Sequence, residues 1–137
     1  MARILALDPG TRRCGVALSD TEETLAFPRP ALEVDMRLIG EIRRLCDDDG
    51  VELVVVGRPR SLAGQETAST HVADEFFHAL ETALEIPVIQ ADERLTTATA
   101  SRQLRDAGVS AKAQRARVDS AAAVVLLESV LEARRAE

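Results

Sequence analysis

Carboxylates stand at three points of this chain at which an apolar segment ends or begins. Asp8 ends the apolar run of residues 3–8, the pair Asp92–Glu93 follows a second such run, and Asp119 precedes a third. Carboxylates that converge in a cleft repel one another unless a cation neutralises them, and Mg²⁺ prefers such hard oxygen ligands. The three positions therefore predict a divalent-cation site if the fold brings them together.

Each of these positions also has a purely structural interpretation. Asp8–Gly10 reads Asp-Pro-Gly, which is a typical turn sequence. Asp119 has the chemistry of a helix N-cap, although Ala122 stands where a capping box would need Glu or Gln. Glu93 and Arg94 are consistent with a surface ion pair. Local sequence leaves both interpretations open.

Other kinds of catalytic site are less well supported by the sequence. Serines 19, 61 and 69 have no convincing histidine nearby for a hydrolase triad, and no third ligand accompanies His71 and His78. Cys14 and Cys46 are too few and too far apart for a zinc motif or a disulfide framework. We expect both cysteines to be small buried apolar residues in a reducing compartment.

The elements that must position the carboxylates begin with a meander. Residues 3–8 and 14–19 predict two strands joined by a short turn, and residues 29–34 predict a weaker third strand, limited by Pro28 and Pro30. The first strand is apolar on both faces, so it should lie centrally, beside the strand predicted at residues 51–57.

After the meander, the spacing of apolar residues alternates between that of helices and that of strands. The later elements expected are a helix from Met36 to Asp49–Gly50, an inner parallel strand at 51–57, a helix at 67–84, a strand at 86–91, a helix from Thr96 or Thr97 to Gly108, and a buried helix at 118–135. This order predicts an α/β fold over residues 1–137: a single domain with a five-stranded mixed sheet and helices on both faces.

In open α/β sheets, ligand sites lie beyond the carboxyl ends of the parallel strands. Asp8, Gly57 and the pair Asp92–Glu93 all end such strands, so they should meet at one edge of the sheet. The start of the last helix could bring Asp119 to the same edge. The predicted topology therefore supports the cation-site interpretation.

Charge is distributed unevenly along the chain. The net charge is −6, with 17 basic and 23 acidic residues, yet only one acid, Asp106, lies between Arg94 and Arg117. The basic residues of that segment are Arg94, Arg102, Arg105, Lys112, Arg115 and Arg117. They predict one basic face that contacts phosphates. Because phenylalanine supplies the only three aromatic residues, we expect nucleic acid to be held by its backbone and shape rather than by base stacking.

The chain carries no apolar stretch long enough to cross a bilayer and no signal-peptide pattern at its start. We therefore expect a cytoplasmic protein without a membrane partner.

Four segments together resemble the YqgF/RuvX family of ribonuclease-H-like proteins. These bacterial proteins are named either for Holliday junction resolution or for nuclease action on pre-16S ribosomal RNA. The segments are Leu7–Thr11 with Gly15–Ala17, Val56–Pro59 with Gly64, Asp92–Thr97, and Val118–Ala122. The resemblance spans nearly the whole chain and implies a ribonuclease-H-like fold and a metal-dependent nuclease.

The resemblance also implies roles for individual residues. Asp8, Glu93 and Asp119 would be the catalytic acids that hold one or two Mg²⁺ or Mn²⁺ ions. Arg58 and Arg60 stand where the family often carries apolar residues, which leaves the details of substrate contact open. The residues assigned to substrate binding are Gly10, Thr11, Arg12, Arg58, Arg94, Thr97, Arg102, Arg105, Lys112, Arg115 and Arg117.

Three functions follow from these observations. We favour a nuclease that matures the 5′ end of pre-16S ribosomal RNA, because resolving a junction calls for a stable dimer and no dimer surface is evident. A Holliday junction resolvase acting on branched DNA, and hence a dimer, stays open. A ribosome-associated factor that binds without cleaving is a further alternative. The Asp-x-Gly-Thr turn also resembles the phosphate loop of actin-like ATPases, which close two such domains over a nucleotide, whereas this chain has one.

Overall fold

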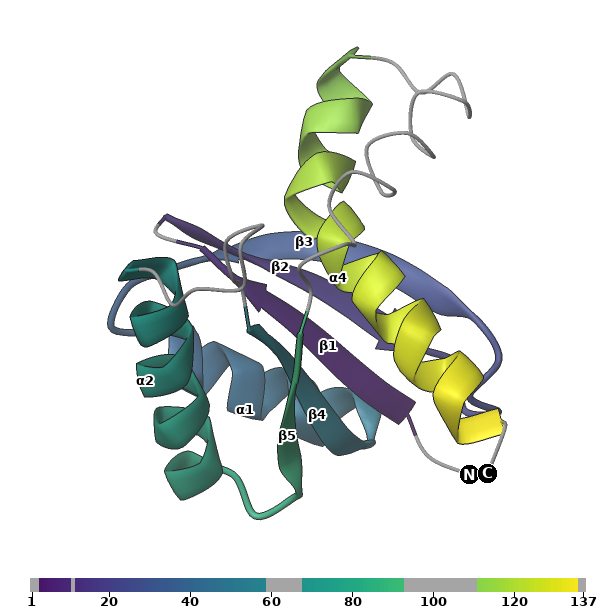
Figure 1. Cartoon of the computed structure of the whole chain (residues 1–137), viewed down its shortest axis with the longest axis horizontal. Helices are drawn as coiled ribbons and strands as arrows, with labels where there is room; N and C mark the ends of the chain where they lie inside the picture. Colours follow the sequence, from purple (N-terminus) through teal and green to yellow (C-terminus); the bar gives the residue numbers. More distant parts are fainter. Residues whose placement is uncertain (1–2, 11, 59–67, 93–110, 136–137) are drawn as a thin grey trace.

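The computed structural model describes residues 3–10, 12–58, 68–92 and 111–135. Within these ranges a single sheet of five strands carries three helices (Figure 1). The strands are β1 (Arg3–Pro9), β2 (Arg13–Ser19), β3 (Ala26–Glu33), β4 (Val51–Arg58) and β5 (Val88–Asp92). The helices are α1 (Leu38–Asp49), α2 (Ala68–Ala83) and α4 (Ala111–Arg135).

The sheet is mixed, with strand order β3-β2-β1-β4-β5. β1 to β3 form the expected antiparallel meander, while β4 is parallel to both β1 and β5. β1 therefore lies in the centre, beside β4, as its apolar sequence predicts. Its residues Ile4–Leu7 are fully buried.

Two apolar clusters cover the two faces of the sheet. Leu5 and Leu7 of β1 pack with residues of α1 and α2, such as Ile42 and Leu80. Ile4 and Ala6 point to the other face, where α4 lies across β1, β2 and β3. Side chains alternate between the faces along a strand, so the predicted helix–sheet–helix layering is confirmed.

The edge strand β3 begins earlier than the sequence suggests. It starts at Ala26 rather than residue 29 and includes both Pro28 and Pro30. Among the described strands, β3 pairs with β2 alone, so one of its sides is open. Proline lacks an N–H group and is tolerated on such an edge.

Helix limits agree with the sequence except in α4. α1 ends where expected: Gly50 has a left-handed φ of 66°, and its N–H bonds the Cys46 carbonyl. α4 begins at Ala111, seven residues before the predicted start at 118. This first part of α4 extends beyond the sheet (Figure 1), so it needs no apolar face to be helical. The helix predicted from Thr96 or Thr97 to Gly108 lies outside the described residues.

Both cysteines are buried, as predicted, and neither forms a disulfide. Burial raises the pKa of the Cys46 thiol to about 11, and the nearby charges of Asp47 and Asp49 add to this effect. Such a thiol is almost entirely protonated at neutral pH and therefore a poor nucleophile. Among the helices that the structure describes, none is both long and apolar enough to span a membrane.

Candidate active site

Asp8 lies near the carboxyl end of β1, where the buried part of the strand gives way to a turn. It is partly buried and pairs with Gly15 of β2. Alternation along β1 places its side chain on the same face as Ile4 and Ala6, which is the face covered by α4. Among residues 3–10, 12–58, 68–92 and 111–135, no hydrogen bond or ion pair holds the Asp8 carboxylate.

The carboxyl ends of the three parallel strands lie at one edge of the sheet. Leu7 of β1 pairs with Val56 of β4, which in turn pairs with Gln90 of β5. Neighbouring strands are about 4.8 Å apart, so β5 runs about 10 Å from β1. Ala91 packs on the α4 face of the sheet. Glu93, two positions later, lies outside the described residues.

Ser120 anchors α4 beside this edge. Its side chain is fully buried, and its Oγ accepts a hydrogen bond of 3.1 Å from the Val16 N–H and donates one of 2.7 Å to the Arg29 carbonyl. Val16 pairs with Leu7, the residue before Asp8. The α4 backbone at Asp119, one residue before Ser120, is thereby held near the end of β1 that carries Asp8.

The turn after Asp8 explains why glycine occupies position 10. The Gly10 N–H donates to the Arg13 carbonyl at 3.0 Å, which closes the turn between β1 and β2. A Cβ on Gly10 would lie 2.7 Å from the same carbonyl oxygen. Glycine is therefore required here by the chain itself, whether or not a ligand approaches. Arg12 is exposed in this turn, at the same end of β1 as Asp8.

The other predicted site residues are described in part or not at all. Arg58 ends β4, and Lys112, Arg115 and Arg117 belong to the first turns of α4, with only their backbones described. The residues outside the described ranges are Thr11, Glu93, Arg94, Thr97, Arg102 and Arg105.

The donor set fits a hard divalent cation. A partly buried carboxylate without a cationic partner in the described chain favours binding a cation, because burial makes an unpaired charge costly. Carboxylate oxygens are the ligands that Mg²⁺ and Mn²⁺ prefer. Within the described residues no group of three or more His, Cys, Asp or Glu side chains forms a metal cluster. Of the three predicted acids, only Asp8 has a described side chain.

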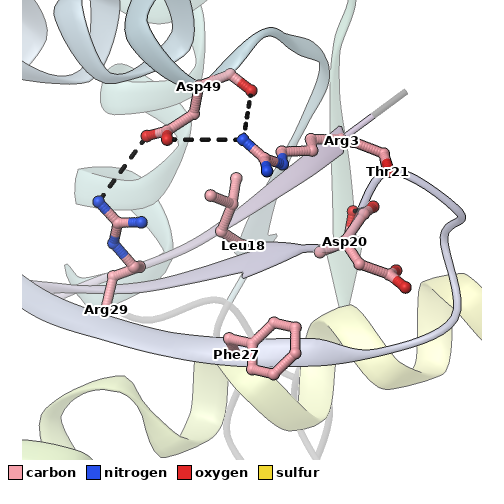
Figure 2. A pocket seen from close by; sticks show the side chains of 8 residues that line it. Arg3, Leu18, Asp20, Thr21, Phe27, Arg29 and Asp49 are labelled. Atoms are coloured by element: carbon pink, nitrogen blue, oxygen red, sulfur yellow. Dashed lines mark hydrogen bonds and ion pairs between the residues drawn. The ribbon is translucent and has the colours of Figure 1, made fainter. Parts of the chain in front are cut away.

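One cavity lies at the end of the sheet where β1 begins, away from Asp8. Figure 2 shows the side chains that line it. It has a volume of about 300 Å³ and is lined by Arg3, Leu18, Ser19, Asp20, Thr21, Phe27, Arg29 and Asp49. Asp49 lies 3.6 Å from the Arg3 guanidinium and 3.7 Å from that of Arg29. Arg3 also donates to the Asp49 carbonyl at 3.0 Å.

The charges around this cavity are satisfied internally. The Asp20 carboxylate accepts hydrogen bonds from Thr24 and from the Leu25 N–H, and these lower its pKa. Arg3 and Arg29 join the end of α1 to β1 and β3 through Asp49. We therefore regard this cavity as part of the contact between α1 and the sheet, and Asp8 as the centre of the candidate active site.

Sequence reasoning missed Ser120 as a contributor to the site. Ser120 is one of two buried polar residues among the described side chains, the other being Ser19. The available signal was a hydroxyl directly before the apolar run Ala121–Leu127, but nothing local indicates its partners, which lie 91 and 104 residues away.

Comparison with known proteins places this geometry in context. A family model described as "RuvX: Holliday junction resolvase" matches residues 2–133. A candidate pre-16S rRNA nuclease of Chloroflexus aurantiacus is 40% identical over 134 residues, covering 96% of this chain and 88% of the relative. Another, from Mycobacterium sp. (strain KMS), is 43% identical over 139 residues, with coverages of 98% and 82%.

Solved structures establish the fold. RuvC of T. thermophilus in complex with a Holliday junction substrate has a TM-score of 0.60 at 14% identity, over 98% of this chain and 96% of that one. The yeast mitochondrial Holliday junction resolvase Ydc2 has a TM-score of 0.57 at 11% identity, over 95% and 78%. The shared fold is ribonuclease-H-like, as the sequence resemblance implies.

The turn geometry predicts opposite effects for two glycine substitutions. Gly10→Ala should lower the free energy of unfolding by about 1–3 kcal/mol, because its Cβ meets backbone that cannot move aside freely. Gly40→Ala is the matched control: Gly40 lies within α1 with nothing within 4 Å of an added Cβ. This change should raise the free energy of unfolding by about 0.5–1 kcal/mol, because alanine favours helix. Urea denaturation measures both, and equal effects would contradict the turn assignment.

Proposed function

The chain belongs to the RuvX family, and from this membership we propose that it is a divalent-metal-dependent nuclease that matures pre-16S ribosomal RNA. The observation that carries the proposal is the Asp8 carboxylate near the end of β1, which has no partner among the described side chains, with the α4 backbone at Asp119 anchored beside it through Ser120. The names of the curated relatives supply the substrate class.

In this proposal, Asp8, Glu93 and Asp119 bind one or two Mg²⁺ or Mn²⁺ ions. The bound metal supplies Lewis acidity, which activates a water molecule and stabilises the oxygen that leaves the phosphodiester. The protein contributes oxygen ligands from three separate elements and a turn that keeps Asp8 at the rim of the sheet. Without a cation these acids would repel the phosphate, so metal binding and substrate binding depend on each other.

A basic rim beside the acids contacts the substrate backbone in this proposal. The rim combines Arg12 and Arg58 with the basic residues between Arg94 and Arg117. α4 begins beyond the sheet (Figure 1), and its first turns carry Lys112, Arg115 and Arg117. In this proposal these residues contact the polyanion. An acidic protein can then bind RNA through one surface while the rest of it stays negative.

Holliday junction resolution is the second candidate function, because the family description names it. Symmetric cleavage of a junction requires two active sites related by a two-fold axis. Two apolar parts of the chain that could form a dimer are instead packed within it. Leu126, Leu127 and Leu131 of α4 are buried on the sheet, and Phe76 and Phe77 pack against the α1–α2 cluster. These contacts favour a monomer and thus the ribosomal substrate.

Asp8→Asn is predicted to remove metal-dependent cleavage. We expect the cleavage rate to fall by more than about 100-fold. Removing a group that only orients a metal ligand typically costs about 10–100-fold, so removal of the ligand itself should cost more. Stability measured in EDTA should stay equal or rise slightly, because one of several repelling carboxylates is gone. Glu93→Gln and Asp119→Asn should behave alike. Asp48→Asn removes an exposed acid on α1 and serves as the charge-matched control. Wild-type turnover in all three site variants at limiting metal would refute the assignment.

The basic rim predicts a salt-dependent affinity. For the catalytically silent Asp8→Asn protein, the slope of log affinity against log salt should become shallower by roughly one unit for each rim contact removed. The double substitution Arg102→Ala, Arg115→Ala tests this by filter binding of a pre-16S fragment. Arg44→Ala removes an exposed arginine of α1, on the other face, and should leave the slope unchanged. An unchanged slope in the double variant would place the RNA elsewhere.

Substrate choice is tested by matched substrates. A pre-16S fragment and a synthetic four-way junction are incubated with the protein and Mn²⁺, and the size of the active species is measured by light scattering. We expect a monomer that cleaves the RNA and leaves the junction intact. A dimer that cuts two junction strands in concert would establish the resolvase instead. Tight RNA binding without cleavage would identify a non-catalytic ribosome factor.

A further inference from the structure

We infer that Ser120 is a positioning residue for the metal site: its hydroxyl fixes α4, and with it Asp119, relative to the strand that carries Asp8. This inference rests on the proposed function, because it assigns Ser120 a task in the binding of the cation. Ser120 itself is buried between the helix and the sheet and contacts no substrate.

The Ser120 hydroxyl is inserted into the sheet. Val16 and Arg29 are partners across β2 and β3. The Val16 N–H donates to Ser120 Oγ, and the hydroxyl donates to the Arg29 carbonyl, so the side chain bridges the two strands. The ladder shifts register at this point, between Cys14 and Val16, which leaves room for the inserted group. The hydroxyl thus satisfies both backbone groups at once.

The apolar contacts that follow Ser120 along α4 do little to fix the position of the helix along its axis. The residues that follow Ser120 are Ala121, Ala122 and Ala123, whose buried methyl groups form a smooth surface. Apolar burial is non-directional and tolerates sliding, whereas hydrogen bonds weaken steeply when their angles change. A slip of one residue along a helix shifts it by about 1.5 Å and rotates it by about 100°. The two bonds of Ser120 oppose such a slip at the point next to Asp119.

The same bonds connect this helix to Asp8. Val16, which donates to Ser120, pairs with Leu7, and the adjacent Gly15 pairs with Asp8. Asp119 is therefore adjacent to Ser120 in the chain, and Asp8 is adjacent to Leu7, the strand partner of Val16. Metal sites lose affinity when the groups that orient their ligands are removed, typically by about 10–100-fold. Ser120 acts here on the backbone that bears the ligand rather than on the ligand itself.

Mn²⁺ binding in the absence of substrate tests this role. Free Mn²⁺ is quantified by electron paramagnetic resonance for the wild type and for Ser120→Ala, well below their melting temperatures. We expect Ser120→Ala to bind Mn²⁺ about 10–100-fold more weakly. Ser129→Ala is the matched control on α4, because Ser129 is exposed and its Oγ bonds only the Val125 carbonyl of its own helix. It should bind Mn²⁺ as the wild type does.

A stability-matched variant separates positioning from general destabilisation. Ile42→Val removes one buried methyl group on the opposite face of the sheet and should lower the melting temperature without moving α4. Ser120→Cys keeps a side chain of similar shape, slightly larger and with a weaker donor and acceptor. It fills the site that Ser120→Ala would leave empty, and it should weaken Mn²⁺ binding by at least about three-fold.

The outcomes distinguish the inference from the proposed function. Suppose that the wild type binds Mn²⁺ and Asp8→Asn does not. If the two Ser120 variants then bind Mn²⁺ as tightly as Ile42→Val does, the positioning role is overturned and the proposed function stands. Failure of the wild type to bind Mn²⁺ overturns the metal site and the inference together. Selective weakening in the two Ser120 variants supports the inference.

Discussion

The hydroxyl of Ser120, held between the Val16 N–H and the Arg29 carbonyl, is the contact on which the candidate active site depends. It joins the last helix to the first antiparallel meander across most of the length of the chain. A buried polar group of this kind contributes little net stability, but it specifies one arrangement, because any other leaves its partners unsatisfied. At this end of the described structure, β1 and β5 are held by strand pairing, and the Ser120 hydroxyl ties α4 to the same sheet.

The remainder of the described structure provides a rigid platform for that contact. β1 is buried on both faces, between the α1–α2 cluster and the α4 cluster, and only its end reaches the rim. Asp8 stands where the packing ends, so its carboxylate is anchored by a stiff strand and is still accessible. The buried side chains of Leu126, Leu127 and Leu131 hold the rest of α4 in place.

The two ends of the sheet differ in how their charged side chains are paired. At the amino end of β1, Arg3 and Arg29 share the Asp49 carboxylate and close the joint with α1 (Figure 2). At the carboxyl end, Asp8 has no such partner in the described chain. A carboxylate neutralised by arginine supports the fold, whereas an unpaired one is available to a cation. This difference, rather than the size of a cavity, is the reason for proposing that the chemistry lies at the Asp8 end of the sheet.

By itself, the sequence determined the features that depend on local pattern. An uninterrupted apolar run makes β1 central, Asp49–Gly50 ends α1 at a left-handed glycine, and Asp8 and Asp92 fall near the ends of strands. The tertiary structure alone decided what depends on distant partners. β3 tolerates two prolines because it lies at an edge, α4 starts early because its first turns extend beyond the sheet, and Gly10 is required by a carbonyl three residues away. The hydrogen bonds of Ser120 could not be predicted either, because nothing in the local sequence indicates which distant backbone groups its hydroxyl will bond.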